Sequence, residues 1–250
     1  METIGLIAAM PQECDALLQR VKQVEKSKLN SFRCYRFNLF GRNCLLVQSG
    51  MGSRRAMDAT RALLNYISPQ FLVSFGIAGA VQGDLAVGDV VVATQTCSLE
   101  QGINEPQPLM VLSDSAWQKA ANHLQSHLAR LVLGTAITTY GTQAISPQLA
   151  SLANPILEME TYGIAQVAAE HKVPLLAIRA ISDGPQAPLP VNLGEMMDAD
   201  ANLLPGRLIR TVMHRPQILW QARQLTSNMK KAAGNAAVAV IEALSLEIPS

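Results

Sequence analysis

The chain has 250 residues, which is enough for one large domain or two small ones. Hydrophobic residues make up 49% of it and charged residues 16%, so the chain can build a sizeable core and extended disorder is excluded. The net charge is +1 and aromatic residues make up only 4%. A nucleic-acid partner is therefore not expected, because it would require a basic surface or a row of stacking rings.

The four cysteines, Cys14, Cys34, Cys44 and Cys97, do not have the spacing of metal ligands. We expect reduced, buried thiols in a cytoplasmic protein, with neither a metal nor a cofactor. The N-terminal residues METIGLIAAMPQEC contain no basic segment and no long apolar run, so a signal peptide is not expected. No apolar run approaches the length of about 18 residues that predicts a membrane-spanning helix.

The apolar pattern predicts strands and helices in alternation along the chain. Strands are expected at residues 4–10, 71–80, 88–94, 135–140, 154–160 and 173–183, with two more around a turn at Gly41 within residues 32–50. Helices are expected from Pro11 through Val21 and at residues 53–67, 115–131 and 161–171. Apolar strands separated by helices indicate a parallel sheet covered on both faces. We therefore predict a single α/β domain with a central, mostly parallel or mixed, twisted sheet flanked by helices, followed by a C-terminal helical tail.

The C-terminal region is basic, with no acidic residue between positions 201 and 241. Its basic residues are Arg207, Arg210, Arg215, Arg223, Lys230 and Lys231. Apolar residues between them predict an amphipathic helix that is interrupted at Pro216. One interpretation is a helix packed on the sheet with its basic side in water, and the other is contact with an anionic membrane surface. We place the α/β domain at residues 1–205 and the helical extension, packed on the same domain, at residues 206–250.

In open parallel sheets, ligands bind beyond the carboxyl ends of the strands. That rule selects Met10, Glu13, Gly76, Glu160, Arg179, Ser182 and Asp183 as candidate site residues. The acids Glu13, Glu160 and Asp183 are expected at one edge of the sheet. Glu158 lies two residues before Glu160, so in an extended segment both would face the same side. A polar helix start is the simpler interpretation of this pair, because helix dipoles favour acids in the first turn.

Other site motifs fit poorly. SGMGSRRA resembles a dinucleotide-binding loop, but Arg55 occupies the third glycine position and no strand with a terminal acid follows at the required distance. A Walker sequence and a GxSxG elbow are both absent from the sequence. His123 and His127 are four residues apart, but no third metal ligand is evident. A carboxylate-based site lined by glycines remains.

Carboxylates suit a reaction that has a cationic transition state and a leaving group in need of a proton, such as glycosidic cleavage. One acid protonates the leaving group, another polarises the nucleophile, and a third group can hold the sugar hydroxyls. Asp183 ends a very apolar strand, where burial would raise its pKa and suit it to the role of the acid.

Five sequence blocks occur in the order and spacing of the nucleoside phosphorylase superfamily: IGLIAAMPQE, SGMG, SFGIAGAVQGDLAVGDVVVA, ILEMET and VPLLAIRAISD. The resemblance covers roughly residues 1–185, and its nearest well-known branch is methylthioadenosine/S-adenosylhomocysteine nucleosidase. It implies a nucleoside phosphorylase-like fold, cleavage of the N-ribosyl bond of a 5′-substituted adenine nucleoside with release of adenine, and a homodimer or larger assembly.

The resemblance also implies roles for individual residues. Asp183 matches the acid that protonates purine N7 as the base leaves. Glu13 matches the carboxylate that orients the attacking water, and Glu160 matches the residue that grips the ribose 2′- and 3′-hydroxyls. The other residues implied to contact or support the substrate are Met159 against the sugar, Arg179 on the nucleophile side, Ser182 beside Asp183, and Met10 and Gly76.

The sequence departs from the superfamily in the phosphate and base regions. Ile77 stands where many members have a hydroxyl residue, and Ser74 stands where phosphate-dependent phosphorylases carry an arginine. Losing both groups weakens the usual phosphate site and favours water as the nucleophile. A phosphate-dependent phosphorylase and a non-catalytic nucleoside-binding protein are the alternatives. Tyr140, in a segment unlike the nucleosidase pattern, is the candidate for stacking on the base.

The tail beyond residue 185 is similar to the hopanoid-associated branch, which removes adenine from adenosylhopane. This similarity rests on proline-rich spacing, the RPQIL element and the absence of acids. It implies a lipid nucleoside as substrate and peripheral contact with the inner face of a membrane. The alternative is that the tail serves in dimerisation or packing.

Overall fold

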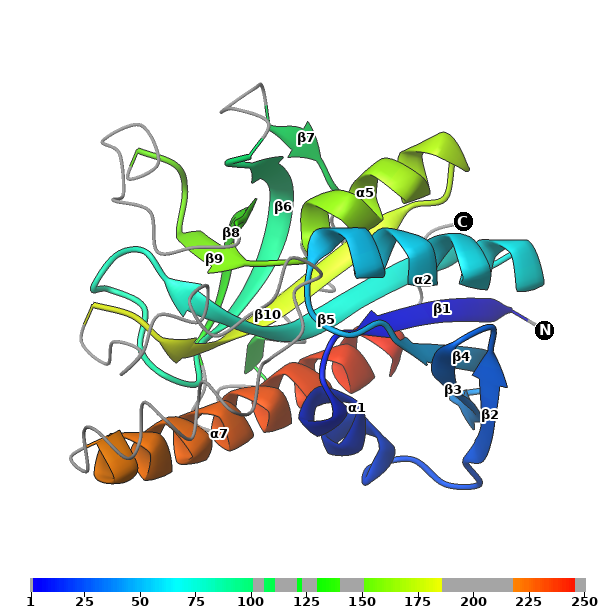
Figure 1. Ribbon diagram of the computed structural model, residues 1–250, viewed down its shortest axis with the longest axis horizontal. Coiled ribbons are helices and arrows are strands. Elements are labelled where there is room, and N and C mark those ends of the chain that lie inside the picture. The colour runs from blue at the N-terminus through cyan, green and yellow to red at the C-terminus, as the bar shows by residue number, and fades with distance from the viewer. Residues whose placement is uncertain are drawn as a thin grey trace.

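Fourteen strands and helices make up the computed structural model, which describes residues 2–100, 106–110, 121–122, 130–139, 151–185 and 218–245 (Figure 1). In chain order they are β1 (Thr3–Ala8), α1 (Pro11–Leu18), β2 (Glu25–Leu29), β3 (Phe32–Leu39), β4 (Arg42–Gln48), α2 (Ser53–Tyr66), β5 (Phe71–Ala80), β6 (Val90–Ser98), β7 (Gln107–Pro108), β8 (Leu131–Thr138), β9 (Pro155–Glu158), α5 (Thr161–Glu170), β10 (Leu175–Asp183) and α7 (Ile218–Ser245).

Most expected elements are present, and the differences have local causes. Strand β2 was not expected, because its sequence EKSKL has no apolar alternation; it pairs antiparallel with β3. Helix α1 ends at Leu18, so the expectation that Val21 extends this helix is wrong, although Val21 still packs on the core. Strand β8 begins at Leu131, four residues before the expected start. The helix expected at 115–131 falls almost entirely outside the described residues, and its last residue belongs to β8.

The sheet contains both parallel and antiparallel pairings. Strands β10, β6, β8, β9 and β5 are hydrogen-bonded in that order, and β10 also pairs with β5, so these strands close a ring. Strands β1, β4, β3 and β2 continue the sheet outward from β5. Within the ring, β6, β8 and β9 run opposite to β5 and β10. The prediction of one α/β domain with a central mixed sheet flanked by helices is confirmed.

Small side chains fill the interior of the ring. One buried cluster draws residues from all of the ring strands: Ala78, Ala80, Leu85, Val91, Ala93, Ala136, Ile156, Ala177 and Ile181. Alanine dominates because a ring of so few strands leaves little room between their facing sides.

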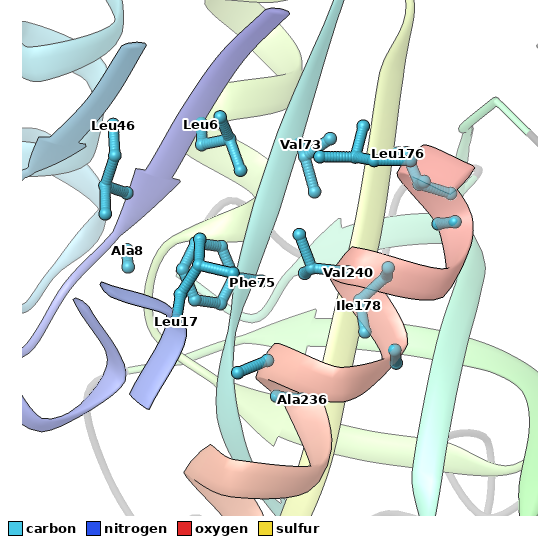
Figure 2. Close-up of a cluster of buried hydrophobic side chains, with 14 of the residues drawn as sticks. Leu6, Ala8, Leu17, Leu46, Val73, Phe75, Leu176, Ile178, Ala236 and Val240 are labelled. Carbon is cyan, nitrogen blue, oxygen red and sulfur yellow. The ribbon is translucent and has the colours of Figure 1, made fainter. Parts of the chain in front are cut away.

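Helices cover the sheet on two faces. Helices α1 and α7 pack on one face, where Leu17, Phe75, Ile178 and Val240 belong to a single buried cluster (Figure 2). Helices α2 and α5 pack on the other face, with their residues clustered around Leu72. The alternation of Leu72 and Phe75 between the two clusters follows from the two-residue period of strand β5.

The second half of helix α7 is part of the core rather than a detachable tail. Its buried residues are Ala232, Ala233, Ala236, Ala237, Ala239, Val240, Ala243 and Leu244. In the first half of α7, Arg223, Lys230 and Lys231 are exposed. Lys231 donates to the carbonyl of Val87 at 3.0 Å. No helix in the described part of the chain is long and apolar enough to cross a membrane. Arg207, Arg210, Arg215 and Pro216 lie outside the described residues.

Candidate active site

Glu13 is held at the start of helix α1 by three backbone groups. Its Oε2 atom accepts hydrogen bonds from the amides of Ala9 at 3.0 Å and Met10 at 2.8 Å. Its Oε1 atom accepts from the amide of Ile77 on β5 at 3.0 Å. Burial raises the pKa of Glu13, while these backbone hydrogen bonds act in the opposite direction. The carboxylate is therefore fixed in one position, with only 3% of the residue exposed.

Gly76 lets Glu13 approach strand β5. A Cβ atom at position 76 would lie 2.4 Å from Oε1 of Glu13, far inside van der Waals contact. The glycine at this position is therefore explained by the carboxylate beside it.

Gly76→Ala is expected to push the Glu13 carboxylate off the Ile77 amide and to reduce catalytic rate by about 10²-fold, as a misplacement of about 1 Å does elsewhere. Steady-state kinetics measure this effect. Gly234→Ala is the matched control for fold and stability, because a Cβ atom there would meet only the end of the Arg20 side chain, at 3.7 Å. Unchanged kcat in Gly76→Ala would show that the position of Glu13 does not matter.

Glu160 connects the starts of two helices. It is the N-cap of α5, and its Oε1 atom accepts a hydrogen bond from the amide of Gly52, the N-cap of α2, at 2.8 Å. Gly52 has a φ of 100°, which favours glycine at the turn that leads into α2. Burial first, and then the charge of Glu158, raise the pKa of Glu160 to about 8.

Glu160→Gln is expected to make the protein more stable than the wild type in alkaline solution. A carboxyl with a folded pKa near 8 and an ordinary value of 4.5 favours folding at low pH and loses that contribution as pH rises through 8. Glutamine removes this titration, so the stability difference should grow with pH by up to about 1.4 kcal/mol per pH unit between the two pKa values. Urea unfolding from pH 5 to 9 tests this, with the exposed Glu170→Gln as control; a pH-independent difference contradicts it.

Glu158 and Arg179 form a buried ion pair. Oε2 of Glu158 lies 3.0 Å from Nη2 of Arg179, and the two side chains are 0% and 2% exposed. The carboxylate of Glu158 also accepts hydrogen bonds from the hydroxyls of Thr138 and Thr161 and from the amides of Glu160 and Thr161. Burial alone would raise the pKa of Glu158, but Arg179 and these donors hold it below its ordinary value.

The extended segment ends at Glu158, so the expectation that Glu158 and Glu160 share a side does not apply. Glu160 has already left the extended conformation, with φ −126° and ψ −37°. Glu158 lies on the same face of β9 as Ile156, which belongs to the cluster inside the ring. The two carboxylates consequently bind different groups.

Asp183 ends strand β10 at an irregularity. The pairing with β5 shifts register between Ile181 and Asp183, so Asp183 lies opposite Gly79. A bulge of this kind re-aims a side chain, and here a Cβ atom on Gly79 would lie 2.8 Å from Oδ2 of Asp183. The hydroxyl of Ser182 donates to Oδ1 of Asp183. Burial raises the pKa of Asp183, and the Ser182 hydrogen bond offsets part of the rise.

A small cavity joins several of the predicted site residues. Its lining residues are Ile7, Ala9, Glu13, Ser74, Phe75, Gly76, Glu160, Ile164 and Arg179. The cavity volume is about 10 Å³, near the least that holds one water molecule. Met10 donates to Glu13 from beside the cavity, and Met159 lies between Glu158 and Glu160, half-buried. Asp183 and Ser182 do not line this cavity, and Tyr140 lies outside the described residues.

The carboxyl ends of β5 and β9 lie close together, but not because the two strands run parallel. Strand β9 runs antiparallel to β5, so the expectation based on parallel strands is wrong for Glu160. The ends still converge because β9 is short and pairs only with the last residues of β5, Leu157 with Gly79 and Ile156 with Ala80.

Several residues that shape the site were not predicted from the sequence. Thr138 and Thr161 hold Glu158, Ser74 accepts a hydrogen bond from Arg179 at 2.8 Å, and Gly52 donates to Glu160. The sequence does indicate that Glu158 is buried and paired: it follows Ile156 by two residues in an apolar strand, where a buried charge needs a partner. Thr138, from a distant strand, has no comparable signal.

The chain is similar to known proteins along most of its length. Residues 3–212 match the family model of the phosphorylase superfamily. The 5′-methylthioadenosine/S-adenosylhomocysteine nucleosidase of Tolumonas auensis is 30% identical over 196 residues, which cover 72% of this chain and 85% of that protein. The corresponding nucleosidase of Haemophilus influenzae is 28% identical over 209 residues, covering 78% and 91%.

Solved structures share the fold. A 5′-methylthioadenosine/S-adenosylhomocysteine nucleosidase from Colwellia psychrerythraea, in complex with adenine, has a TM-score of 0.71 at 22% identity and covers 98% of this chain and 95% of its own. The futalosine hydrolase of Helicobacter pylori has a TM-score of 0.67 at 18% identity, covering 98% and 97%. The family model and the curated relatives define the chain as an enzyme that cleaves N-glycosidic bonds, either a nucleosidase or a nucleoside phosphorylase, as predicted from the sequence. The chain belongs to the phosphorylase superfamily.

Proposed function

We propose that the protein hydrolyses the N-ribosyl bond of an adenine nucleoside with a bulky 5′ substituent and releases adenine. The observation that carries the proposal is the placement of Glu13, Glu160 and Asp183 along one strand, β5. Glu13 and Glu160 line a cavity with Gly76, and Asp183 faces Gly79. Nucleosidases acting on methylthioadenosine and adenosylhomocysteine among the relatives support the substrate class.

Glu13 and Asp183 contact β5 at different positions. Glu13 lies beside Gly76 and Asp183 beside Gly79, so the two carboxyl groups reach the strand three residues apart and can act on different parts of the substrate. Glu13 is assigned to the water, Asp183 to the base, and Glu160 to the sugar hydroxyls between them.

A side chain of this protein is assigned to each step of the proposed reaction. Asp183, whose pKa is raised by burial, is assigned as the acid that gives a proton to N7 of the adenine while the C1′–N9 bond breaks and its electron pair moves to the base. Glu13 accepts a proton from the water whose oxygen forms the new bond to C1′. The carboxylates stabilise the cationic sugar of the transition state. Met159 is assigned to the apolar side of the sugar, Ser182 to the support of Asp183, and Tyr140 to the base.

Incubation with methylthioadenosine, adenosylhomocysteine, adenosine and adenosylhopane, with and without phosphate, tests the proposal by chromatography of released adenine. We expect release that does not depend on phosphate. Release only with phosphate supports the phosphorylase alternative, and no release from any substrate rejects the proposed class. Binding without release would support the non-catalytic alternative.

We further propose a lipid nucleoside as substrate, reached in the cytoplasm by peripheral contact with the inner membrane face, and a homo-oligomeric assembly. The exposed Arg223 and Lys230 of helix α7 support an attraction to anionic lipid. Because the later turns of α7 are part of the core, deleting the tail would remove core residues and does not test this contact.

Charge reversal tests the membrane contact without disturbing the core. Arg223→Glu/Lys230→Glu should lower binding to anionic vesicles, whereas Lys26→Glu/Lys28→Glu, with the same charge change on the exposed strand β2, should not. Equal loss in both variants, or none in either, rejects a specific contact through α7. Light scattering of the full chain tests the assembly, and a monomer rejects it.

A further inference from the structure

The direction of the Asp183 side chain depends on the register shift near the end of β10. Ile181 pairs with Ala78 of β5 and belongs to the cluster inside the ring. In unbroken register Asp183, two residues later, would pair with Ala80 and point the same way. The shift brings Asp183 opposite Gly79 instead, on the alternate face of β5. The contacts that hold β10 at Ile181 therefore decide where the Asp183 carboxyl lies.

A tight turn before β6, the Ala86–Asp89 turn, binds both backbone groups of Ile181. The amide of Gly88 donates to the carbonyl of Ile181 at 2.8 Å, and the amide of Ile181 donates to the carbonyl of Asp89 at 2.9 Å. The turn is closed by the amide of Asp89, which donates to the carbonyl of Ala86 at 3.0 Å. The turn thus fixes β10 two residues before Asp183, where the pairing with β5 begins to shift.

Helix α7 in turn binds the Ala86–Asp89 turn through two side chains. Nζ of Lys231 donates to the carbonyl of Val87 at 3.0 Å, and Nδ2 of Asn235 donates to the carbonyl of Gly88 at 2.7 Å. The two donors are four residues apart, so they lie on the same side of the helix. Gly88 has a φ of 99°, and a Cβ atom there would lie 2.6 Å from Cε of Lys231. Glycine at this position therefore allows both the turn and its close contact with α7.

The part of α7 that carries these donors is packed on β10 itself. Ala236 and Val240 belong to the same buried cluster as Ile178 of β10 (Figure 2). Asn235 is adjacent to Ala236 and is half-buried. The helix that packs on β10 thus also presents the amide that binds the turn, and helix, turn and strand support one another around Ile181.

We propose that Asn235, with the assistance of Lys231, positions the Asp183 carboxyl for proton donation. Helix α7 holds the Ala86–Asp89 turn, the turn holds Ile181, and the register shift beyond Ile181 directs the carboxyl to the face of Gly79. Asn235 acts through backbone groups of the turn, so it is a positioning residue and not a catalytic one. The role of Asp183 is taken from the proposed function, on which this inference rests.

The kcat of adenine release from methylthioadenosine by the full chain tests the role of Asn235. Asn235→Ala removes the donor to Gly88 and should lower kcat about tenfold with little change in KM, because a displaced acid affects the transition state more than substrate binding. Asn228→Ala is the matched control. It makes the same substitution two turns earlier in α7, where the side chain accepts a hydrogen bond from Gln224, and its kcat should equal that of the wild type. Equal kcat in Asn235→Ala and Asn228→Ala overturns the inference.

A double-mutant cycle with Asp183→Asn separates positioning from a general loss of structure. Asn235→Ala should lower the rate of the wild type but not the remaining rate of Asp183→Asn, because asparagine has no proton to place. The same fold-loss in both backgrounds would mean that Asn235 only supports the fold, and would overturn the inference. If Asn235→Ala does not fold, Asn235→Asp replaces it, because aspartate keeps the shape and removes the donor.

The hold on Ile181 can also be measured without turnover. Hydrogen exchange of the Ile181 amide should be faster in Asn235→Ala than in the wild type or Asn228→Ala. The carboxyl carbon resonance of Asp183 should titrate at a different pH in the same variant. Failure of all nucleosides as substrates would reject the proposed function and leave these two measurements to decide the inference. Unchanged exchange and unchanged titration would overturn it even where the wild type releases adenine.

Discussion

Asp183→Asn is expected to lower kcat for adenine release by about 10²–10⁴-fold, the usual contribution of a positioned general acid. Asparagine is close in shape to the carboxyl and can still accept the hydrogen bond from Ser182, but it has no proton to give to N7. The loss should appear in kcat, with KM changed little, because the missing interaction belongs to the transition state. Steady-state kinetics with methylthioadenosine provide the measurement.

Asp84→Asn is the matched control for this variant, because it makes the same change on an exposed side chain. Its activity should equal that of the wild type. Full activity in Asp183→Asn would exclude Asp183 as the acid. Tight nucleoside binding with no turnover in either the wild type or the variant would instead favour the non-catalytic alternative.

Arg179→Met is expected to lower the free energy of unfolding by about 3–5 kcal/mol at neutral pH, the usual cost of removing one partner from a buried ion pair. The variant leaves the Glu158 carboxylate buried without its cation, although Thr138 and Thr161 still donate to it. The double variant Glu158→Leu/Arg179→Met should regain most of the lost stability, because apolar side chains need no partner inside the ring. Urea unfolding of the single and double variants measures the coupling.

The cost of Arg179→Met should depend on pH in a defined direction. Arg179 helps to hold the pKa of Glu158 below its ordinary value of 4.5, so the pair stabilises the fold above that pH and loses its contribution as pH falls. Protonated Glu158 requires no cation, and the difference between wild type and variant should shrink in acid. A difference that stays constant from pH 7 to pH 4 would mean that packing, and not charge, accounts for the loss.

Local pattern was enough to predict most elements of the fold. The apolar runs that became β1, β5 and β10, and the helical spacing of α2 and α5, depend on neighbours in the sequence, whose period of two or 3.6 residues fixes the buried side. The positions of Glu13, Glu160 and Asp183 at strand ends followed from the same patterns. The edge strand β2 was missed because an exposed strand has no need of apolar alternation.

What the sequence by itself determined, then, was the α/β class, the superfamily and a set of acids at strand ends, because these are encoded within short blocks. Only the tertiary structure decided how the acids differ. The ring of strands brings Thr138, Glu158 and Arg179 together from β8, β9 and β10, and pairings between strands so far apart in the chain leave no local signal. Their contacts make Glu158 the buried partner of a cation, and burial without such a partner raises the pKa of Glu160, two residues away. Glu158 and Glu160, two residues apart in the sequence, thus acquire different chemistry because different residues surround them in space.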